Sequence, residues 1–254
     1  MSDRSPNPFV APPLLVLALI AQSACAKQEP VDSCKVATTA MGVEYKVTSD
    51  GTSSTVYAAL HVGDWDTNTF VGLCSGDALV VHVGGKDYPL QQNKGDSSDK
   101  ASYGASLGGV VAGDFVLDYT RASGASAVGN KLSLPPPFML TGPTGAQSRR
   151  SPLTLSWDGA GAGYTITIVI EDSPGNTCIH RFTKSVVGDP GNVTLNGGEL
   201  VAASGHEKDA CPLAITVERG IVVQETAGGF SSEFGHRSRR EATQVRRSTL
   251  SSVE

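Results

Sequence analysis

Short segments in which apolar and polar residues alternate with a period of two recur along most of the chain. The pattern is clear in 43–47 (VEYKV), 115–119 (FVLDY), 153–157 (LTLSW) and 165–170 (TITIVI), and no stretch shows a sustained helical spacing. Successive side chains of a β-strand point to opposite faces, so this period predicts half-buried strands. The chain is therefore predicted to be all-β, built as two antiparallel β-sandwiches.

The composition favours many short strands joined by turns. The 254 residues include 29 glycines and 14 prolines, and only 18% of the residues are charged. This blend is richer in turn-forming residues and poorer in charge than that of a typical helical protein. The formal net charge is −5, so the chain has no overall positive field that would hold a polyanion. Nucleic acid is not an expected partner.

The first 24 residues have the length and flanks of a secretory signal peptide. An apolar run, VAPPLLVLALIA, precedes the small residues Ser23 and Ala24. A helix needs about 20 apolar residues to span the roughly 30 Å of a bilayer core, and this run is too short for that. We therefore expect an exported chain whose signal peptide covers residues 1–24.

The stretch Gln22-Ser23-Ala24-Cys25 resembles the lipobox of bacterial lipoproteins. Ser23, Ala24 and Cys25 match the family's pattern, whereas Gln22 stands where the family prefers leucine. The resemblance implies cleavage before Cys25, acylation of its thiol and of the new terminus, and attachment to the lipid bilayer of the envelope, with the outer membrane as the expected location. The alternative is ordinary cleavage after Ala24 or Ala26, which would leave a periplasmic or secreted chain.

The five cysteines are an odd number, which leaves one unpaired in an oxidising compartment. If Cys25 carries the lipid, the other four fall two in each half of the chain. Pairing within halves, Cys34 with Cys74 and Cys178 with Cys211, is the economical choice among three connectivities. Each bond would close a loop of roughly 35 to 40 residues, worth about 3 to 4 kcal/mol in the chain-entropy model.

Changes in composition divide the rest of the chain. Residues 25–33 are polar and are expected to tether the lipid to the first strand. The prolines at 135–137 favour extended chain and cannot donate ladder hydrogen bonds, which indicates a connector between a first sandwich at 34–136 and a second at 137–227. After residue 227 the apolar pattern stops and arginine, serine and glycine dominate. Residues 228–254 are therefore predicted to be a disordered basic tail.

The second half opens on a recognisable series of apolar, proline and glycine residues. The series consists of Pro137, Phe138, Leu140, Pro143, Gly145, Ser148, Arg149, Leu153, Leu155 and Trp157. It resembles the opening strands of immunoglobulin-like repeats in uncharacterised bacterial surface lipoproteins, and the resemblance implies a sandwich without catalytic residues. Cys178 and Cys211 both follow Trp157, unlike the family's spacing, so only the sandwich architecture is carried over.

One acidic loop has part of a calcium-binding pattern. Asp64, Asp66 and Asn68 occupy the first, third and fifth places of a calcium loop, but Thr69 and Ser75 stand where such a loop has a glycine and a bidentate glutamate. Acidic turn residues are the ordinary explanation of such a segment. These three residues are the only candidate ligands that the sequence offers for calcium, and no metal is predicted.

Two histidines lie in strand-like segments. Adjacent strands could bring His61 and His82 together with Asp64 as a metal trio, although strand histidines are usually solvent-facing or bonded to a single partner. No nucleophile motif or metalloprotease motif accompanies them. No cofactor and no catalytic residue are therefore predicted.

Several loops are expected between the strands. Residues 159–163 (GAGAG) lie between two clear strands and are expected to be their hairpin loop. Residues 91–109 are polar and rich in glycine and serine, which indicates a long loop or a poorly formed edge strand. Because loops on a rigid sandwich carry recognition, ligand contacts are expected from 63–69 and 91–109.

These patterns favour a non-enzymatic, membrane-anchored lipoprotein of the cell envelope that binds a protein or glycan ligand or has a structural role. The alternatives are a secreted hydrolase or metal-dependent enzyme with a dispersed site, and an exported inhibitor or assembly factor. Clustering of His61, His82 and Asp64 within metal-ligand distance would favour the enzyme. Their separation on unrelated faces, with no pocket, would favour the binding protein.

Overall fold

The computed structural model describes residues 29–95, 100–143, 145–159, 161–172, 178–225, 228–230 and 238–254. The predicted signal peptide, Cys25 and the first part of the predicted tether lie outside these residues. Within the described ranges the chain forms eighteen strands and two short 3-10 helices. The predicted all-β fold is therefore confirmed.

The largest sheet has nine strands in the order β15-β14-β17-β18-β2-β3-β8-β7, with β12 paired in addition to β18. Its strands are β2 (Met41–Ser49), β3 (Ser53–Val62), β7 (Gln91–Gln92), β8 (Ser102–Gly108), β12 (Ala146–Ser148), β14 (Gly161–Asp172), β15 (Phe182–Asp189), β17 (Cys211–Glu225) and β18 (Ser238–Val253).

Two smaller sheets cover one face of this sheet, and a short parallel pair lies beside it. The four-stranded sheet, in the order β10-β9-β5-β6, contains β5 (Ala78–Val83), β6 (Lys86–Pro89), β9 (Asp114–Thr120) and β10 (Ala127–Ser133). The three-stranded sheet, in the order β11-β13-β16, contains β11 (Leu140–Thr141), β13 (Leu153–Trp157) and β16 (Asn192–Leu195). The parallel pair joins β1 (Val31–Asp32) to β4 (Val71–Gly72), and η1 (Ser33–Lys35) and η2 (Thr38–Ala40) follow β1.

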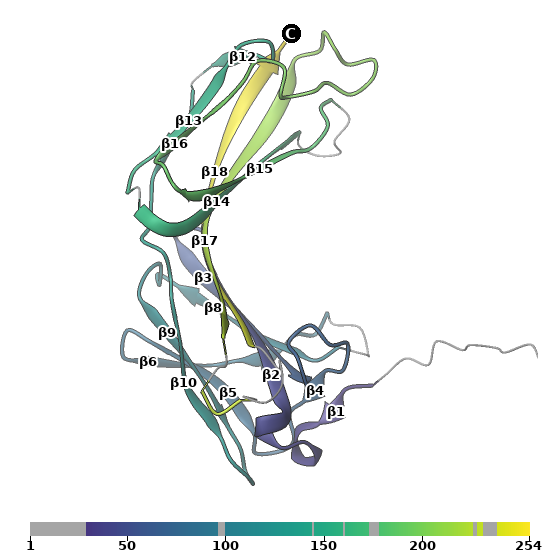
Figure 1. Ribbon diagram of the computed structural model, residues 1–254, viewed down its shortest axis with the longest axis vertical. Helices are drawn as coiled ribbons and strands as arrows, with labels where there is room; N and C mark the ends of the chain where they lie inside the picture. Colours follow the sequence, from purple (N-terminus) through teal and green to yellow (C-terminus); the bar gives the residue numbers. More distant parts are fainter. Residues whose placement is uncertain are drawn as a thin grey trace, which may run out of the picture.

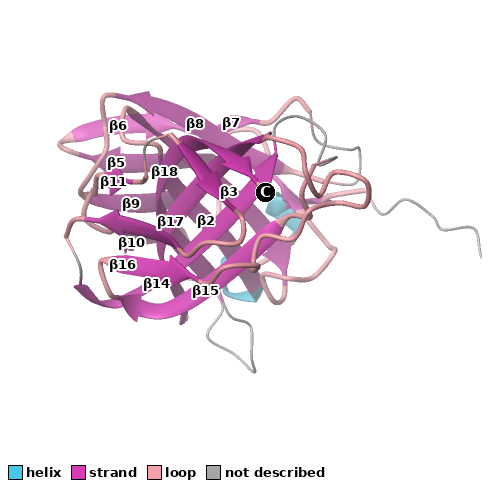
Figure 2. Cartoon of the chain, turned by 90° about the horizontal axis from the view of Figure 1, so that it is seen from above, coloured by secondary structure: helices cyan, strands magenta, loops and turns pink. Residues whose placement is uncertain are grey.

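The nine-stranded sheet is shared by two lobes. The first lobe contains the four-stranded sheet and the β2–β3–β8 part of the large sheet, and the second contains the three-stranded sheet and the β14–β15 part. β17 and β18 pair along their length and join the lobes at a waist near Gly220 and its partner Thr243. Figure 1 shows the resulting crescent, with the nine-stranded sheet along its hollow side and the smaller sheets outside. In the end-on view of Figure 2, β9 and β16 again lie to one side of β2 and β17.

Each lobe has its own hydrophobic cluster. The first cluster contains residues between Met41 and Leu134 together with Phe230 and Ala242, and the second contains residues between Phe138 and Val217 together with Leu250. The period-two pattern determines which residues enter them: in β14, Ile166, Ile168 and Ile170 are fully buried, because those side chains share the packed face. The clusters separate at the proline segment that was expected to be a connector.

The prediction of a disordered tail at 228–254 is wrong for residues 238–253, whereas residues 231–237 lie outside the described residues. Residues 238–253 form β18, which lies between β17 and β2 in the middle of the large sheet. Its buried side is largely polar: the Gln244 amide donates to the carbonyl oxygens of Val111 at 2.8 Å and Pro135 at 3.1 Å. Hydrogen bonds take the place of an apolar stripe in this strand. A hydrophobicity pattern cannot detect such a strand.

Three further segments differ from expectation. The end of the predicted tether is not free, because the Val31 N–H donates to the Phe70 carbonyl at 2.8 Å and β1 pairs with β4. Residues 159–163 are not a hairpin loop, because β13 pairs with β11 and β16 whereas β14 pairs with β15 and β17. Residues 91–109 contain β8, which pairs with β3 over seven residues.

Candidate functional site

The two strand histidines lie in different sheets. His61 is on β3 of the nine-stranded sheet, and its Nδ1 lies 2.8 Å from the carbonyl oxygen of Thr67. His82 is on β5 of the four-stranded sheet, where Nδ1 lies 2.7 Å from Asp87 and Nε2 lies 3.2 Å from Asp118. In the part of the chain that the structure describes, no three His, Cys, Asp or Glu side chains gather as a metal site. The metal trio of His61, His82 and Asp64 is not assembled.

The acidic loop 63–69 uses its polar groups to close itself. The Asp64 carboxylate accepts the N–H of Trp65 at 2.9 Å. The Thr67 hydroxyl lies 2.9 Å from the carbonyl oxygen of Val62 and 3.1 Å from that of Asp64. Asp66 and Asn68, the other two candidate calcium ligands, are exposed. The loop therefore has the character of a self-bonded turn.

Both predicted disulfides are confirmed. Cys34 bonds to Cys74, and Cys178 bonds to Cys211, with Cα atoms 5.8 Å and 6.0 Å apart. Two disulfides within one chain are consistent with an exported protein. One bond lies in each lobe, as pairing within halves of the sequence predicts.

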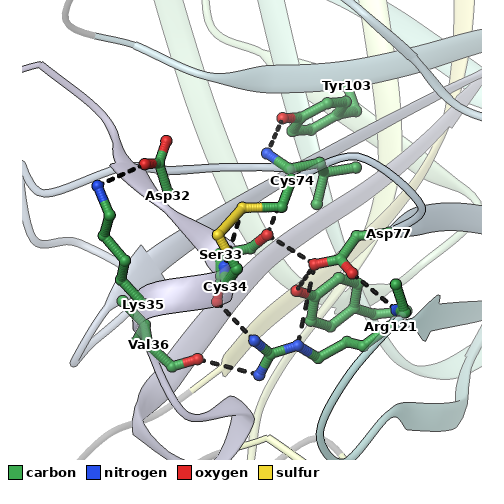
Figure 3. Close-up of a disulfide and its surroundings, with 12 residues drawn as sticks. Asp32, Ser33, Cys34, Lys35, Val36, Cys74, Asp77, Tyr103 and Arg121 are labelled. Carbon is green, nitrogen blue, oxygen red and sulfur yellow. Dashed lines mark hydrogen bonds and ion pairs between the residues drawn. A yellow bond between two sulfur atoms is a disulfide. The ribbon is translucent and has the colours of Figure 1, made fainter.

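A buried ion pair next to Cys34–Cys74 holds the start of the described chain to the first lobe (Figure 3). Arg121 lies against Asp77, with both side chains buried, and donates to the carbonyl oxygens of Ser33 at 2.6 Å and Val36 at 3.0 Å. Burial opposes ionisation of Asp77, but hydrogen bonds from Ser33, the Ala122 N–H and Tyr119 together with Arg121 keep its pKa below the usual range. These bonds attach the segment around Ser33 and Val36 to the first lobe.

One face of the nine-stranded sheet carries no covering sheet. Along β18, Ala242 and Gln244 point to the packed face, whereas Glu241, Thr243 and Arg247 alternate with them on the other side. We call this second side the open face. It lines the hollow side of the crescent and continues across both lobes (Figure 1).

The loop 63–69 crosses the open face in the first lobe, next to Gly42 on β2. It can do so because Gly42 on β2 has no side chain: a Cβ there would lie 2.6 Å from the carbonyl oxygen of Gly63 and 2.9 Å from the nitrogen of Trp65. The Trp65 ring then lies 4.9 Å from the Arg239 guanidinium, a cation–π contact. Arg239 also forms an ion pair with Glu241 at 2.9 Å. The loop that was expected to contact a ligand therefore borders the open face.

A groove of about 290 Å³ lies on the open face at the waist. We call it the waist groove. It lies where β14, β17 and β18 run side by side, and Gly220 and Thr243, which are register partners, form its centre. Its lining residues are Gly163, Thr165, Thr167, Glu218, Gly220, Ile221, Val222, Glu241 and Thr243.

Glu218 gives the waist groove its electrostatic character. The carboxyl group is half-buried, and burial is the main reason that its pKa is raised; the nearby Glu241 adds to the shift, while Arg247 and Arg181 oppose it. Within the described ranges, Glu218 has no ion-pair partner. Glu241, in contrast, is held by Arg239. One carboxylate of the groove is thus ion-paired, and the other has no ion-pair partner among the described residues.

Gly220 has no structural reason to be glycine within the described chain. Its φ angle is outside the left-handed region that favours glycine. A Cβ on Gly220 would lie 3.5 Å from Thr243 Oγ1 and 3.7 Å from the carbonyl oxygen of Ala242, which are ordinary contacts. Glycine inside a strand weakens it and often marks a place where a ligand approaches closely. The missing side chain leaves the floor of the groove open.

The waist groove was not found from the sequence. The sequence signal that could have indicated the groove is the glycine that opens GIVVQE, directly after LAITVE and one arginine. A lone glycine in a strand pattern indicates a bulge or a close approach. The groove also needs residues from β18, which was expected to be disordered.

Among the described residues, no helix is long and apolar enough to span a bilayer.

The similarity to the solved structures described here is low, with TM-scores below 0.3. No family model and no curated protein matches the chain. A chain of a cytokine receptor complex aligns at 15% identity and a TM-score of 0.29, covering 81% of this chain and 94% of that one. The mouse nectin-like molecule 4 ectodomain (Ig1–Ig3) aligns at 12% identity and 0.26, covering 83% and 65%. The chicken CNTN1 FN1–FN3 domains align at 11% identity and 0.26, covering 84% and 65%.

Proposed function

We propose that this chain is a non-enzymatic binding protein of the cell envelope, held at the membrane by acylation of Cys25, and that its ligand binds in the waist groove. Gly220 is the observation that carries the proposal. A central strand keeps a glycine there although neither its backbone angle nor its neighbours require one. A bound ligand supplies the reason, because it needs the space that a side chain would fill.

The placement of the two ends of the described chain supports an anchored orientation. β1 lies at the lower end of the first lobe, and the carboxyl terminus lies at the far end of the second lobe (Figure 1). Arg121 and the Cys34–Cys74 bond fix the entry point of the tether. With a lipid on Cys25, the first lobe stands next to the bilayer and the waist groove stands one lobe away from it.

The anchoring part of the proposal is tested by intact-mass analysis of the native protein from its own envelope. We expect a mature chain that begins at Cys25, carries three acyl groups, and has lost four hydrogens in two disulfides. An unmodified chain that begins at Cys25 or Lys27 would refute acylation and leave the binding role to be tested separately.

The binding part is tested by cross-linking whole cells that produce either the native chain, Gly220→Val or Val187→Ala. Valine at 220 fills the groove, whereas Val187 is an exposed residue of the open face, outside the groove. We expect one set of cross-linked products for the native chain and for Val187→Ala, and loss of those products for Gly220→Val at equal protein levels. Identical products in all three would show that the ligand binds elsewhere.

A further inference from the structure

We propose that the waist groove receives a lysine or arginine side chain of a partner protein, whose cationic group lies over Gly220 between the Glu218 carboxylate and the Thr243 hydroxyl. This inference rests on the proposed function and names the chemistry of its ligand.

The hydroxyl of Thr243 is the first support. Thr243 is only 9% exposed, and within the described part of the chain its hydroxyl has no hydrogen-bond partner. Its Oγ1 lies 3.5 Å from the vacant Cβ position of Gly220, so it faces the floor of the groove. The Thr243 hydroxyl oxygen is open to the groove rather than sealed from water, so a ligand atom can reach it. A ligand atom over Gly220 would provide that partner.

The charge of the groove is the second support. Glu218 has no ion-pair partner within the described ranges, whereas Glu241 has Arg239, which is itself fixed against Trp65. Arg239 is therefore already paired with Glu241 and does not neutralise Glu218. Arg247 and Arg181 lower the pKa of Glu218, but among the described residues neither forms an ion pair with it. A positively charged ligand group in direct contact with this half-buried carboxylate would offset the energy lost by desolvation. The net charge of −5 of the whole chain also attracts a basic partner.

The size of the groove favours one side chain over a larger ligand. Its volume of about 290 Å³ is at the lower limit of the roughly 300 to 1,000 Å³ of pockets for drug-sized molecules. A lysine ammonium has three donors and a guanidinium has five. Glu218, Thr243 and Thr165 offer acceptors around the same opening. The acceptors of the groove therefore match the donors of a basic side chain.

The test uses fluorescein-labelled hexalysine and hexaarginine, with hexaglutamine as the neutral peptide and a neutral hexasaccharide as the alternative ligand. Binding to the full chain is followed by fluorescence anisotropy at physiological salt. We expect one of the basic peptides to bind, hexaglutamine not to bind, Glu218→Gln to weaken binding at least tenfold and Thr243→Val to weaken it several-fold. Glu171→Gln removes the same charge from β14 outside the groove and is expected to change binding less than twofold.

A second readout separates a specific site from general attraction. Nuclear magnetic resonance titration of the Glu218 carboxyl group should show its pKa falling when the basic peptide is added, because a nearby cation stabilises the carboxylate. Equal weakening by Glu218→Gln and Glu171→Gln, or an unchanged Glu218 titration, would overturn the inference.

The outcomes also distinguish this inference from the proposed function. If the hexasaccharide binds the native chain and not Gly220→Val, while the basic peptides do not bind, the inference fails and the binding role of the groove stands. If Gly220→Val leaves both the peptide binding and the cellular cross-links unchanged, the groove is not a ligand site and both proposals fail.

Discussion

The two faces of the β17–β18 ladder are both polar at the waist, but only one of them is satisfied by the chain itself. On the packed face, Arg219 is fully buried, ion-paired with Asp189 at 2.6 Å, and donates to the carbonyl oxygens of Pro136 at 3.0 Å and Asp158 at 2.7 Å. On the open face, the adjacent Glu218 has no ion-pair partner within the described ranges. Arg219 on the packed face contacts both lobes, whereas Glu218 on the open face forms no ion pair among the described residues.

On the packed face, Arg219 belongs to a network of contacts rather than to a single ion pair. Asp189 also accepts the indole N–H of Trp157 at 2.6 Å, and the Arg219 guanidinium lies 4.6 Å from the ring of Phe138. The segment that links the lobes ends at Pro136, so Arg219 contacts the linker and the second lobe together. Its loss would leave Asp189 as an uncompensated buried charge.

The largest expected effect follows from breaking this network. Arg219→Ala should lower the free energy of unfolding by about 3 to 5 kcal/mol, because it removes one partner of a buried ion pair. Arg247→Ala, which removes an exposed arginine from the open face, should change it by about 0.5 kcal/mol or less. Urea unfolding of both variants measures the difference, and equal values would contradict the distinction between the two faces.

The second prediction concerns the packed face of β18 near its end. Leu250 belongs to the hydrophobic cluster of the second lobe, so Leu250→Ala should cost about 2 to 5 kcal/mol through lost burial and the cavity left behind. Thr249→Ala, on the open face one residue away, is the matched control and should be nearly neutral. Thermal unfolding that is unaffected by Leu250→Ala would show that this strand does not complete the second core.

The third prediction is a gain, rather than a loss, in the free energy of unfolding from a substitution on the open face. Gly220→Ala should raise the free energy of unfolding by about 0.5 to 1 kcal/mol, because alanine costs less conformational entropy than glycine inside a strand and the added Cβ meets only ordinary contacts. Chemical unfolding measures the gain. A loss of stability would mean that the fold itself needs glycine at the waist, which would weaken the case for a ligand.

The smallest effect is expected at an exposed ion pair in the first lobe, outside the large sheet. Asp87 and Asp118 raise the pKa of His82, and the main cause is the hydrogen bond that the imidazole donates to the Asp87 carboxylate. A raised pKa gives stability that is fully present below the unfolded pKa, near 6.5, and is lost as pH rises through the folded pKa. Because the pair is partly exposed, the change should be about 0.5 kcal/mol.

The measurement for His82 is the free energy of unfolding at pH 5.5 and pH 8.5 for the native chain and for His82→Asn. The free energy of unfolding should change less between pH 5.5 and pH 8.5 in His82→Asn than in the native chain, by about 0.5 kcal/mol. His180→Asn, at an exposed histidine of the second lobe, is the control and should keep the native difference. Identical pH dependence of all three chains would contradict the role of Asp87 and Asp118.

Much of the candidate site was hidden from sequence reasoning for one physical reason. On the strand that lies between β17 and β2, the amide nitrogen of the buried Gln244 and the guanidinium of Arg246 donate to distant carbonyl oxygens, those of Val111 at 2.8 Å and Phe138 at 2.7 Å. Neither side chain is apolar, so the period-two signal is absent. Partners that lie more than a hundred residues away can be identified only after the chain has folded.

By itself the sequence predicted the all-β fold and the two cysteine pairs, because alternation, turn residues and cysteine spacing are local properties of the chain. The tertiary structure alone decided that residues 238–253 complete both lobes and that Glu218, Gly220 and Thr243 form one groove. Strand order and register are set by long-range hydrogen bonding and packing, which no short segment of sequence contains.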